Sequence, residues 1–127
     1  MSTAGTVSKQ KFKIKITGKG EVTASLYRHL SPSTLLRLNK ILPFETHAIR
    51  QKGTVIMPVD IIAGKEKIRD EFKRGEIVFG LQEGAVVVFL EEIKVSRKYN
   101  ILGEVETGLD LLDNIVHSET VKIERIE

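Results

Sequence analysis

The C-terminal segment 100–127 constrains the fold of this chain most strongly, because glycines divide it into strands and one short helix. Gly103 interrupts an apolar run, and a glycine inside a strand usually accompanies a bulge, a bend or a close approach of two backbones. Residues 104–106 alternate between polar and apolar, as in a half-buried strand. The apolar spacing over 109–116 predicts an amphipathic helix, and the alternation at 121–124 predicts a closing strand.

Short alternating strands are predicted along most of the remaining chain. In residues 11–17, isoleucine and phenylalanine face one side and lysines the other, and a glycine-containing turn leads into a second alternating strand at 22–26. Further hairpins are predicted around Gly53 and Gly84. The segment 86–90 is apolar on both faces, which predicts the most buried strand of the protein. Regular short strands separated by turns favour a sandwich or a barrel.

Three other segments have distinct patterns. Ser31 followed by Pro32 predicts the capped start of a helix, and a leucine-rich face continues this helix until Pro43. The charged segment 63–74 could form a strand with a loop or one helical turn, and we expect the strand with a loop. Residues 91–98 are expected to form a polar connection to the C-terminal segment.

The composition is that of an ordinary soluble domain. We expect residues 1–10, which are mostly small and polar, to form a flexible tail before a single domain at 11–127. The chain lacks cysteine, a signal-peptide core and any apolar run long enough to span a membrane, which predicts a cytoplasmic protein. Its net charge of +3 comes from basic residues interleaved with acidic ones, which argues against a nucleic-acid surface. Scarce asparagine and glutamine beside abundant lysine and glutamate are typical of heat-adapted proteins.

Three motifs follow one another along the chain, and their order is informative. They are Pro32-Ser33-Thr34, Leu102-Gly103-Glu104-Val105 and Glu106-Thr107-Gly108-Leu109-Asp110-Leu111-Leu112. In this order the chain resembles the cyclophilins, which are barrel-shaped prolyl isomerases. It resembles more closely the small prokaryotic and archaeal cyclophilin-like proteins, which share the barrel but lack most of the isomerase site. The resemblance implies an all-β fold, a closed eight-stranded barrel capped by two helices.

The resemblance also implies where an isomerase site would lie. Prolyl isomerisation rotates a stiff bond without a nucleophile, so the enzyme needs an apolar pocket for the proline ring and a cation near the amide nitrogen. Arg50 is the candidate cation. The candidate pocket residues are Met57, Phe79, Phe89, Tyr99 and Leu102. Tyr99 and Lys94 stand where the family has histidine and tryptophan, so the pocket would lose two ring contacts. The alternative for these residues is a structural one: a strand-pairing arginine and ordinary core side chains.

These observations lead us to expect a non-catalytic binding module that takes a small molecule or a peptide at the barrel rim or pocket. A weak peptidyl-prolyl isomerase that uses Arg50 and an apolar pocket is the alternative. The three histidines lie apart, without the spacing of metal ligands, and the chain contains no phosphate loop or cofactor motif, so neither a metal nor a cofactor is expected. Nucleic acid and membrane partners are not expected, and a barrel this small could associate with a second copy through an exposed face.

Overall fold

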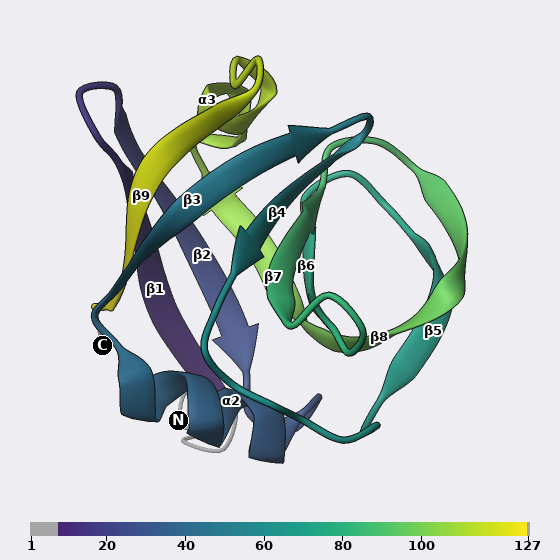
Figure 1. Cartoon of the computed structure of the whole chain (residues 1–127). Helices are drawn as coiled ribbons and strands as arrows, with labels where there is room; N and C mark the ends of the chain where they lie inside the picture. The colour runs from purple at the N-terminus through teal and green to yellow at the C-terminus, as the bar shows by residue number, and fades with distance from the viewer. Residues whose placement is uncertain (1–7, 127) are drawn as a thin grey trace, which may run out of the picture.

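The computed structural model describes residues 8–126 and shows a β-barrel with a helix at each end (Figure 1). The strands are β1 (Lys9–Ile16), β2 (Gly20–Tyr27), β3 (Phe44–Gln51), β4 (Thr54–Pro58), β5 (Ile68–Phe72), β6 (Glu76–Gly80), β7 (Ala85–Phe89), β8 (Ile93–Thr107) and β9 (Ser118–Arg125). The helices are α2 (Pro32–Ile41) and α3 (Leu109–Asp113). Since β1 begins at Lys9, the last two residues of the predicted tail 1–10 belong to a strand, and residues 1–7 lie outside the described part.

Within residues 8–126, eight of the strands close into a barrel. Neighbours in the sheet follow the order β2-β1-β9-β3-β4-β7-β6-β8, and β8 pairs back with β2 to complete the ring. Every pairing is antiparallel, which agrees with the alternating polar and apolar residues of β1 and β9. The predicted closed eight-stranded barrel is confirmed, and β5 pairs with β8 outside this ring.

Gly103 permits the closure of the ring. A Cβ atom at this position would lie 1.9 Å from the backbone oxygen of Ser25 and 2.9 Å from the Cα of Leu26, both on β2. Gly103 pairs with Leu26 in the β2–β8 register. The sequence predicted a bulge, a bend or a close approach here, and the structure contains a close approach of two backbones together with a register shift beside Gly103 in the β6–β8 pairing.

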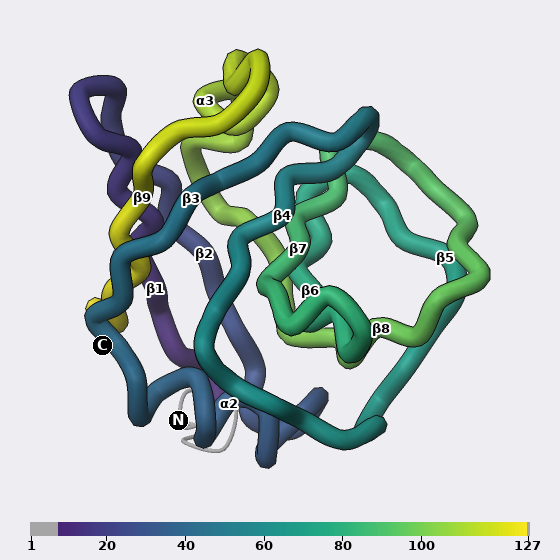
Figure 2. Tube along the Cα trace, in the orientation of Figure 1, coloured from purple at the N-terminus to yellow at the C-terminus, as the bar shows by residue number. Residues whose placement is uncertain are grey.

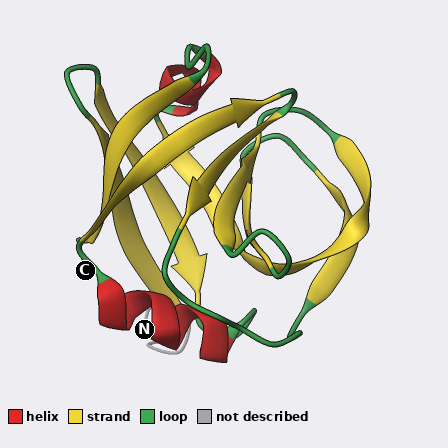
Figure 3. Ribbon diagram, in the orientation of Figure 1, coloured by secondary structure: helices red, strands yellow, loops and turns green. Residues whose placement is uncertain are grey.

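Two helices cap the barrel, as predicted, and the structure places them at its opposite ends (Figure 3). Helix α2 buries Leu35 and Leu38, whereas Leu36 is 58% exposed. Helix α3 is shorter than the predicted segment 109–116, because it ends at Asp113. Ile115 rather than Val116 is then buried, and the side chain of Val116 is 74% exposed.

The barrel lumen holds the larger of two hydrophobic clusters, which we call the lumen core. The eight strands of the ring contribute residues to it, as β7 does with the alternate residues Val86 and Val88. Its buried members are Phe12, Ile14, Ile16, Val22, Ala24, Leu26, Leu35, Leu38, Ala48, Val55, Met57, Val59, Ile77, Phe79, Val86, Val88, Leu90, Leu102, Leu112, Ile115, Val121 and Ile123.

The outer face of the same wall carries a second cluster, which we call the outer core. It consists of Phe72, Val78, Val87, Phe89, Tyr99 and Ile101. The strands β5 and β8 curve around this face (Figure 2). Strand β7 is therefore buried on both faces, as predicted for 86–90. The expected polar connection at 91–98 is wrong, because β8 begins at Ile93, and Ile93 and Val95 pack against the outer core while their polar neighbours face solvent.

Candidate functional site

The predicted pocket residues lie in two separate places. Met57, Phe79 and Leu102 belong to the lumen core, where each is at most 1% exposed. Phe89 and Tyr99 belong to the outer core. Since neighbouring strand positions face opposite sides of a sheet, the barrel wall separates the two groups. The structure therefore does not bring these five residues together around one cavity.

The two outer members of the predicted pocket do contact each other. The rings of Phe89 and Tyr99 meet edge to face at 5.9 Å, and Phe72 stacks on Phe89 at 4.6 Å between ring centroids. The Tyr99 hydroxyl donates a hydrogen bond of 2.6 Å to Glu83. Burial, followed by this hydrogen bond, raises the pKa of Tyr99 to about 12. The three rings pack directly against one another, and Phe89 is 0% exposed, so no room is left beside it for a proline ring.

Arg50, the predicted cation, holds the C-terminal end of α3 against the barrel. Its Nη1 donates to the backbone oxygens of Asp113 at 2.7 Å and Ile115 at 3.3 Å, and its Nε donates to the oxygen of Lys52 at 2.8 Å. The last carbonyls of a helix lack partners within the helix, and arginine side chains are common donors to them. The contacts give Arg50 a structural role in this position.

Arg74 reinforces the same end of the barrel. Its guanidinium forms two hydrogen bonds with the Asp113 carboxylate, at 2.8 and 2.5 Å, and a third with the backbone oxygen of Leu90 at 2.8 Å. The hydrogen bonds from Arg74 outweigh partial burial and hold the pKa of Asp113 below its ordinary value. Arg50 and Arg74 thus anchor the C-terminal end of α3 through hydrogen bonds to Asp113 and Ile115.

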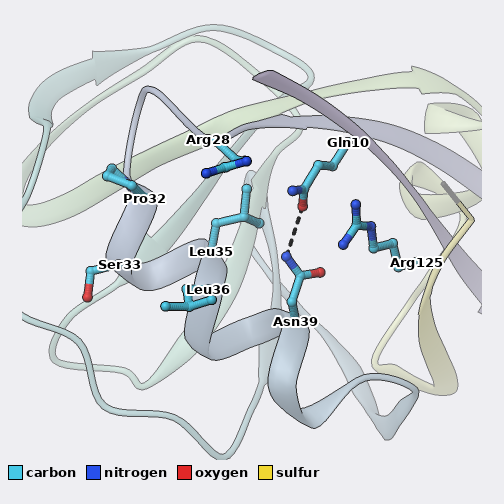
Figure 4. Close-up of a pocket in the computed structure, with 8 residues that line it drawn as sticks. All are labelled: Gln10, Arg28, Pro32, Ser33, Leu35, Leu36, Asn39 and Arg125. Atoms are coloured by element: carbon cyan, nitrogen blue, oxygen red, sulfur yellow. Dashed lines mark hydrogen bonds between the residues drawn. The ribbon is translucent and has the colours of Figure 1, made fainter. Parts of the chain in front are cut away.

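The opposite end of the barrel has an open groove of about 600 Å³ beside α2 (Figure 4). The residues around it come from β1, α2, β9 and the segment between β2 and α2. They are Gln10, Arg28, Pro32, Ser33, Leu35, Leu36, Asn39 and Arg125. Leucine and proline side chains provide an apolar surface, while Arg28 and Arg125 provide two positive charges.

An amide pair lies between the two arginines in Figure 4. Asn39 Nδ2 donates a hydrogen bond of 2.9 Å to Gln10 Oε1. The other oxygen of this pair, Asn39 Oδ1, is buried and has no hydrogen-bond partner among the described residues. Because buried amide oxygens are ordinarily paired, this acceptor is a polar group that a bound N–H could satisfy after a small rotation of the side chain.

The start of α2, which borders the groove, is capped by a residue distant in sequence. Glu66 accepts hydrogen bonds from the backbone N–H groups of Ser33 and Thr34, at 3.0 and 2.7 Å, and from the Thr34 hydroxyl at 2.5 Å. The predicted cap, Ser31, instead donates its hydroxyl to the backbone oxygen of Ile101. A carboxylate suits this place because the first N–H groups of a helix lack internal partners and carry partial positive charge.

The capping hydrogen bonds change the acidity of Glu66. Partial burial alone would raise the pKa of this carboxyl. The hydrogen bonds from Thr34 and Ser33, together with the charge of Arg37, outweigh that effect and hold the pKa below its ordinary value. Asn100, which is completely buried, secures the same segment by accepting from the Glu66 N–H at 2.8 Å.

The groove was missed by the sequence analysis, although the sequence contains one signal for it. Leu36 follows Leu35 directly in the leucine-rich helix, so the two side chains cannot both lie fully on the buried face. Two adjacent leucines on a short helix indicate that the apolar surface extends beyond the part that the barrel covers. The groove borders this exposed part.

Other kinds of site are not found in the described part of the chain. Residues 8–126 contain no group of three or more histidine, aspartate or glutamate side chains that could hold a metal ion. Across the same range, no helix has the length and apolar character required to span a bilayer.

Comparison with known proteins gives structural matches. No family model matches the chain, and no curated protein matches it by sequence. The chain is similar in structure to a hypothetical protein from Archaeoglobus fulgidus, studied in solution, with a TM-score of 0.80 and 19% identity over 98% of this chain and 99% of that chain. It is also similar to a cyclophilin-type peptidyl-prolyl cis-trans isomerase from Cryptosporidium parvum, with a TM-score of 0.62 and 15% identity over 94% of this chain and 98% of that chain. At these identities the similarity shows the fold alone: the chain has the cyclophilin-like barrel fold.

Proposed function

We propose that this protein is a non-catalytic binding module that takes a carboxylate-bearing ligand, a small molecule or a peptide, in the groove beside α2. The observation that supports this most is the groove itself, an apolar surface next to the exposed guanidinium group of Arg28. Concave surfaces with a few polar groups are the usual form of ligand sites. Guanidinium groups are well suited to carboxylates, because their N–H donors match the two oxygens.

The surroundings of Arg50 support a binding role over the isomerase alternative. An isomerase would need the cation beside an apolar pocket that admits a proline ring. In this structure the Arg50 guanidinium donates to backbone carbonyls around α3, and the aromatic ring of Phe89 is closed off within the outer core. The polar and apolar parts that an isomerase must combine are therefore apart.

The test is a titration with the N-acetylated tripeptide Glu-Leu-Glu, followed by calorimetry and by thermal unfolding. We expect saturable binding and a rise in Tm for the wild-type protein, because a ligand that binds the folded state stabilises it. Arg28→Glu, which reverses a charge in the groove, should remove both effects. Lys15→Glu makes the same change in net charge on an exposed lysine of β1 and should leave both unchanged.

The isomerase alternative is tested with the same preparations. We expect no acceleration of prolyl isomerisation in a short Xaa-Pro peptide beyond the uncatalysed rate. An acceleration that Arg50→Ala reduces by about tenfold, which corresponds to roughly 1.4 kcal/mol of barrier, would contradict the proposal and assign the isomerase site. Failure of the tripeptide to bind would contradict it as well.

A further inference from the structure

We infer that the binding site continues across α2 into a second groove, and that its occupant is an acidic amphipathic segment of a partner protein. This inference rests on the proposed function. The second groove has a volume of about 600 Å³, like the first, and lies along the other side of α2. Ser33 and Leu36 border both grooves, so the two form one continuous surface over the helix.

The apolar part of this surface is larger than either groove alone suggests. Leu36 is 58% exposed, and Ile62, which borders the second groove, is 84% exposed. The partly buried side chains of Ile41 and Ile61 lie beside them. Single exposed apolar residues are common, but a continuous group with a hollow on each side is typical of an interaction surface.

The wall of the second groove is fixed in place by hydrogen bonds. Arg37 Nη1 donates to the backbone oxygen of Ile62 at 3.1 Å, which ties the loop to the helix. At one end of this loop, Val59 N–H donates to the backbone oxygen of Gly84 at 3.0 Å. At the other end, Glu66 caps α2. A groove that exists before binding lowers the entropic cost of association.

The charges around the two grooves select an acidic partner. Among the described residues that border them, Arg28, Arg37, Lys40 and Arg125 are basic, and Asp60 alone is acidic. Two copies of such a surface would bring like charges together, which argues against self-association through this face. The described residues that border the grooves include no aromatic side chain on which a nucleic-acid base could stack.

The geometry favours an extended segment over a small molecule. Filling both grooves requires crossing the exposed width of a helix, roughly 10 Å. An extended chain advances about 3.3 Å per residue, so the crossing takes on the order of three residues. A peptide with apolar anchors on each side of Leu36 and carboxylates beside them would match the surface. Each groove can accept an apolar side chain of such a peptide, whereas a flat membrane surface would leave both grooves unfilled.

The test compares two peptides on the same protein by fluorescence anisotropy. The probes are fluorescein-labelled Glu-Leu-Glu and a longer peptide, Glu-Leu-Glu-Ile-Glu-Glu-Leu-Glu. We expect the longer peptide to bind at least about tenfold more tightly, because it reaches the second groove. Versions with lysine in place of each glutamate, or with serine in place of each apolar residue, should lose this gain.

The variants separate this inference from the proposed function. Lys40→Glu and Ile62→Ser alter exposed residues of the second groove, and an unchanged Tm verifies that both variants fold. Each should remove the gain of the longer peptide and leave binding of the tripeptide unchanged, while Lys15→Glu should alter neither.

Four results would overturn the inference. If the longer peptide binds no more tightly, or if its gain survives both variants, the first groove acts alone and only the proposed function stands. If the protein binds vesicles of anionic lipid through Ile62 and Lys40 but shows no peptide gain, the occupant is a membrane surface. If neither peptide binds, the proposed function itself fails.

Discussion

The two faces of the barrel wall use the same strands but are covered in different ways. The lumen core is enclosed by a ring of strands in which every member has two neighbours. The outer core is covered mainly by β5 and the first half of β8, and β5 pairs only with β8 among the described strands. A sheet that is apolar on both faces must be shielded from water on both, and closing the ring shields only the inner face. The outer face is shielded by β5 and the first half of β8, which we call the outer cover. Since β5 pairs with β8 alone among the described strands, the outer cover should open more readily than the ring.

The lumen core and the outer core also differ in the kind of side chain that fills them. Aliphatic side chains dominate the lumen core, whereas three of the six outer-core residues, Phe72, Phe89 and Tyr99, are aromatic. Phe72 meets the edge of Tyr99 at 6.0 Å in addition to stacking on Phe89. Paired rings bring a large apolar area together with few residues, which suits a small cover.

The largest expected effect concerns the closure of the ring. Gly103→Ala places a Cβ atom against the backbone of β2, which cannot move without disturbing the β2–β8 pairing. We expect a loss of about 4 kcal/mol or more in the free energy of unfolding, measured by urea denaturation. In the control Gly64→Ala, no atom beyond the chain neighbours would lie within 4 Å of the new Cβ. The loss should therefore be clearly smaller, and equal losses would contradict the account.

The next prediction compares one phenylalanine from each core. Phe79 of the lumen core and Phe72 of the outer core are each 1% exposed. Phe79→Ala should cost about 3–5 kcal/mol in global unfolding. Phe72→Ala should act mainly on the outer cover, so that amide hydrogen exchange accelerates in β5 and the first half of β8 while the ring strands stay protected. Uniform acceleration in both variants would show that the two cores unfold as one unit.

A smaller effect is expected from the hydroxyl of Tyr99. Tyr99→Phe removes one of the two donors to Glu83 Oε2, leaving Arg97 Nη1 at 3.2 Å, while Glu83 Oε1 already lacks a hydrogen-bond partner among the described residues. We expect a loss of about 1–2 kcal/mol in the free energy of unfolding, and faster amide exchange near this residue. Val95→Ala, which trims a partly buried neighbour without touching this hydrogen bond, serves as a comparison.

The same residue gives a pH dependence with a definite sign. The pKa of Tyr99 is raised from 10.0 to about 12, so the folded state holds its phenolic proton more tightly than the unfolded state. This contribution to stability is fully present below pH 10 and is lost as the pH rises toward 12. The hydrogen bond to Glu104 also raises the pKa of Tyr27, the only other tyrosine, to about 12. Phenolate absorbance of Tyr27→Phe therefore reports Tyr99 alone, and titration near pH 10 would contradict the buried arrangement.

The smallest expected effect is at the α2 cap, outside both cores. Glu66→Gln keeps an acceptor but removes the charge, and we expect a loss of about 0.5–1 kcal/mol at neutral pH. Because the pKa of Glu66 is lowered in the folded state, its contribution is present above the ordinary value of 4.5 and is lost as the pH falls through the folded value. Urea denaturation at neutral and acidic pH should show the two proteins converging in acid. A constant difference would contradict a charged cap.

Most of the fold could be predicted from the sequence because alternation and turn residues act locally. The hairpins around Gly53 and Gly84 and the doubly apolar strand 86–90 follow from such patterns. The start of β8 was missed because its exposed polar residues outnumber Ile93 and Val95, whose period-two spacing was the available signal. For 63–74, the expected strand with a loop is confirmed by β5.

The candidate site could not be predicted in this way, because long-range contacts create it. Gln10, Arg28, Asn39 and Arg125 belong to separate segments, which meet through the pairing of β1 with β2 and β9 and the packing of α2 beside them. The cap of α2 comes from Glu66, more than thirty positions beyond Ser33. The five predicted pocket residues fall into two separate cores because periodicity along one strand does not show which of its faces lies toward the lumen.

The most direct test of the central claim locates the bound ligand by NMR. In a titration of the isotope-labelled protein with the longer acidic peptide, we predict saturable shifts of the backbone amides in 28–41 and 60–62, around the two grooves. The amides of Phe72, Phe89 and Tyr99 should keep their positions. Saturable shifts centred on these outer-core residues, or the absence of saturable shifts, would contradict the account.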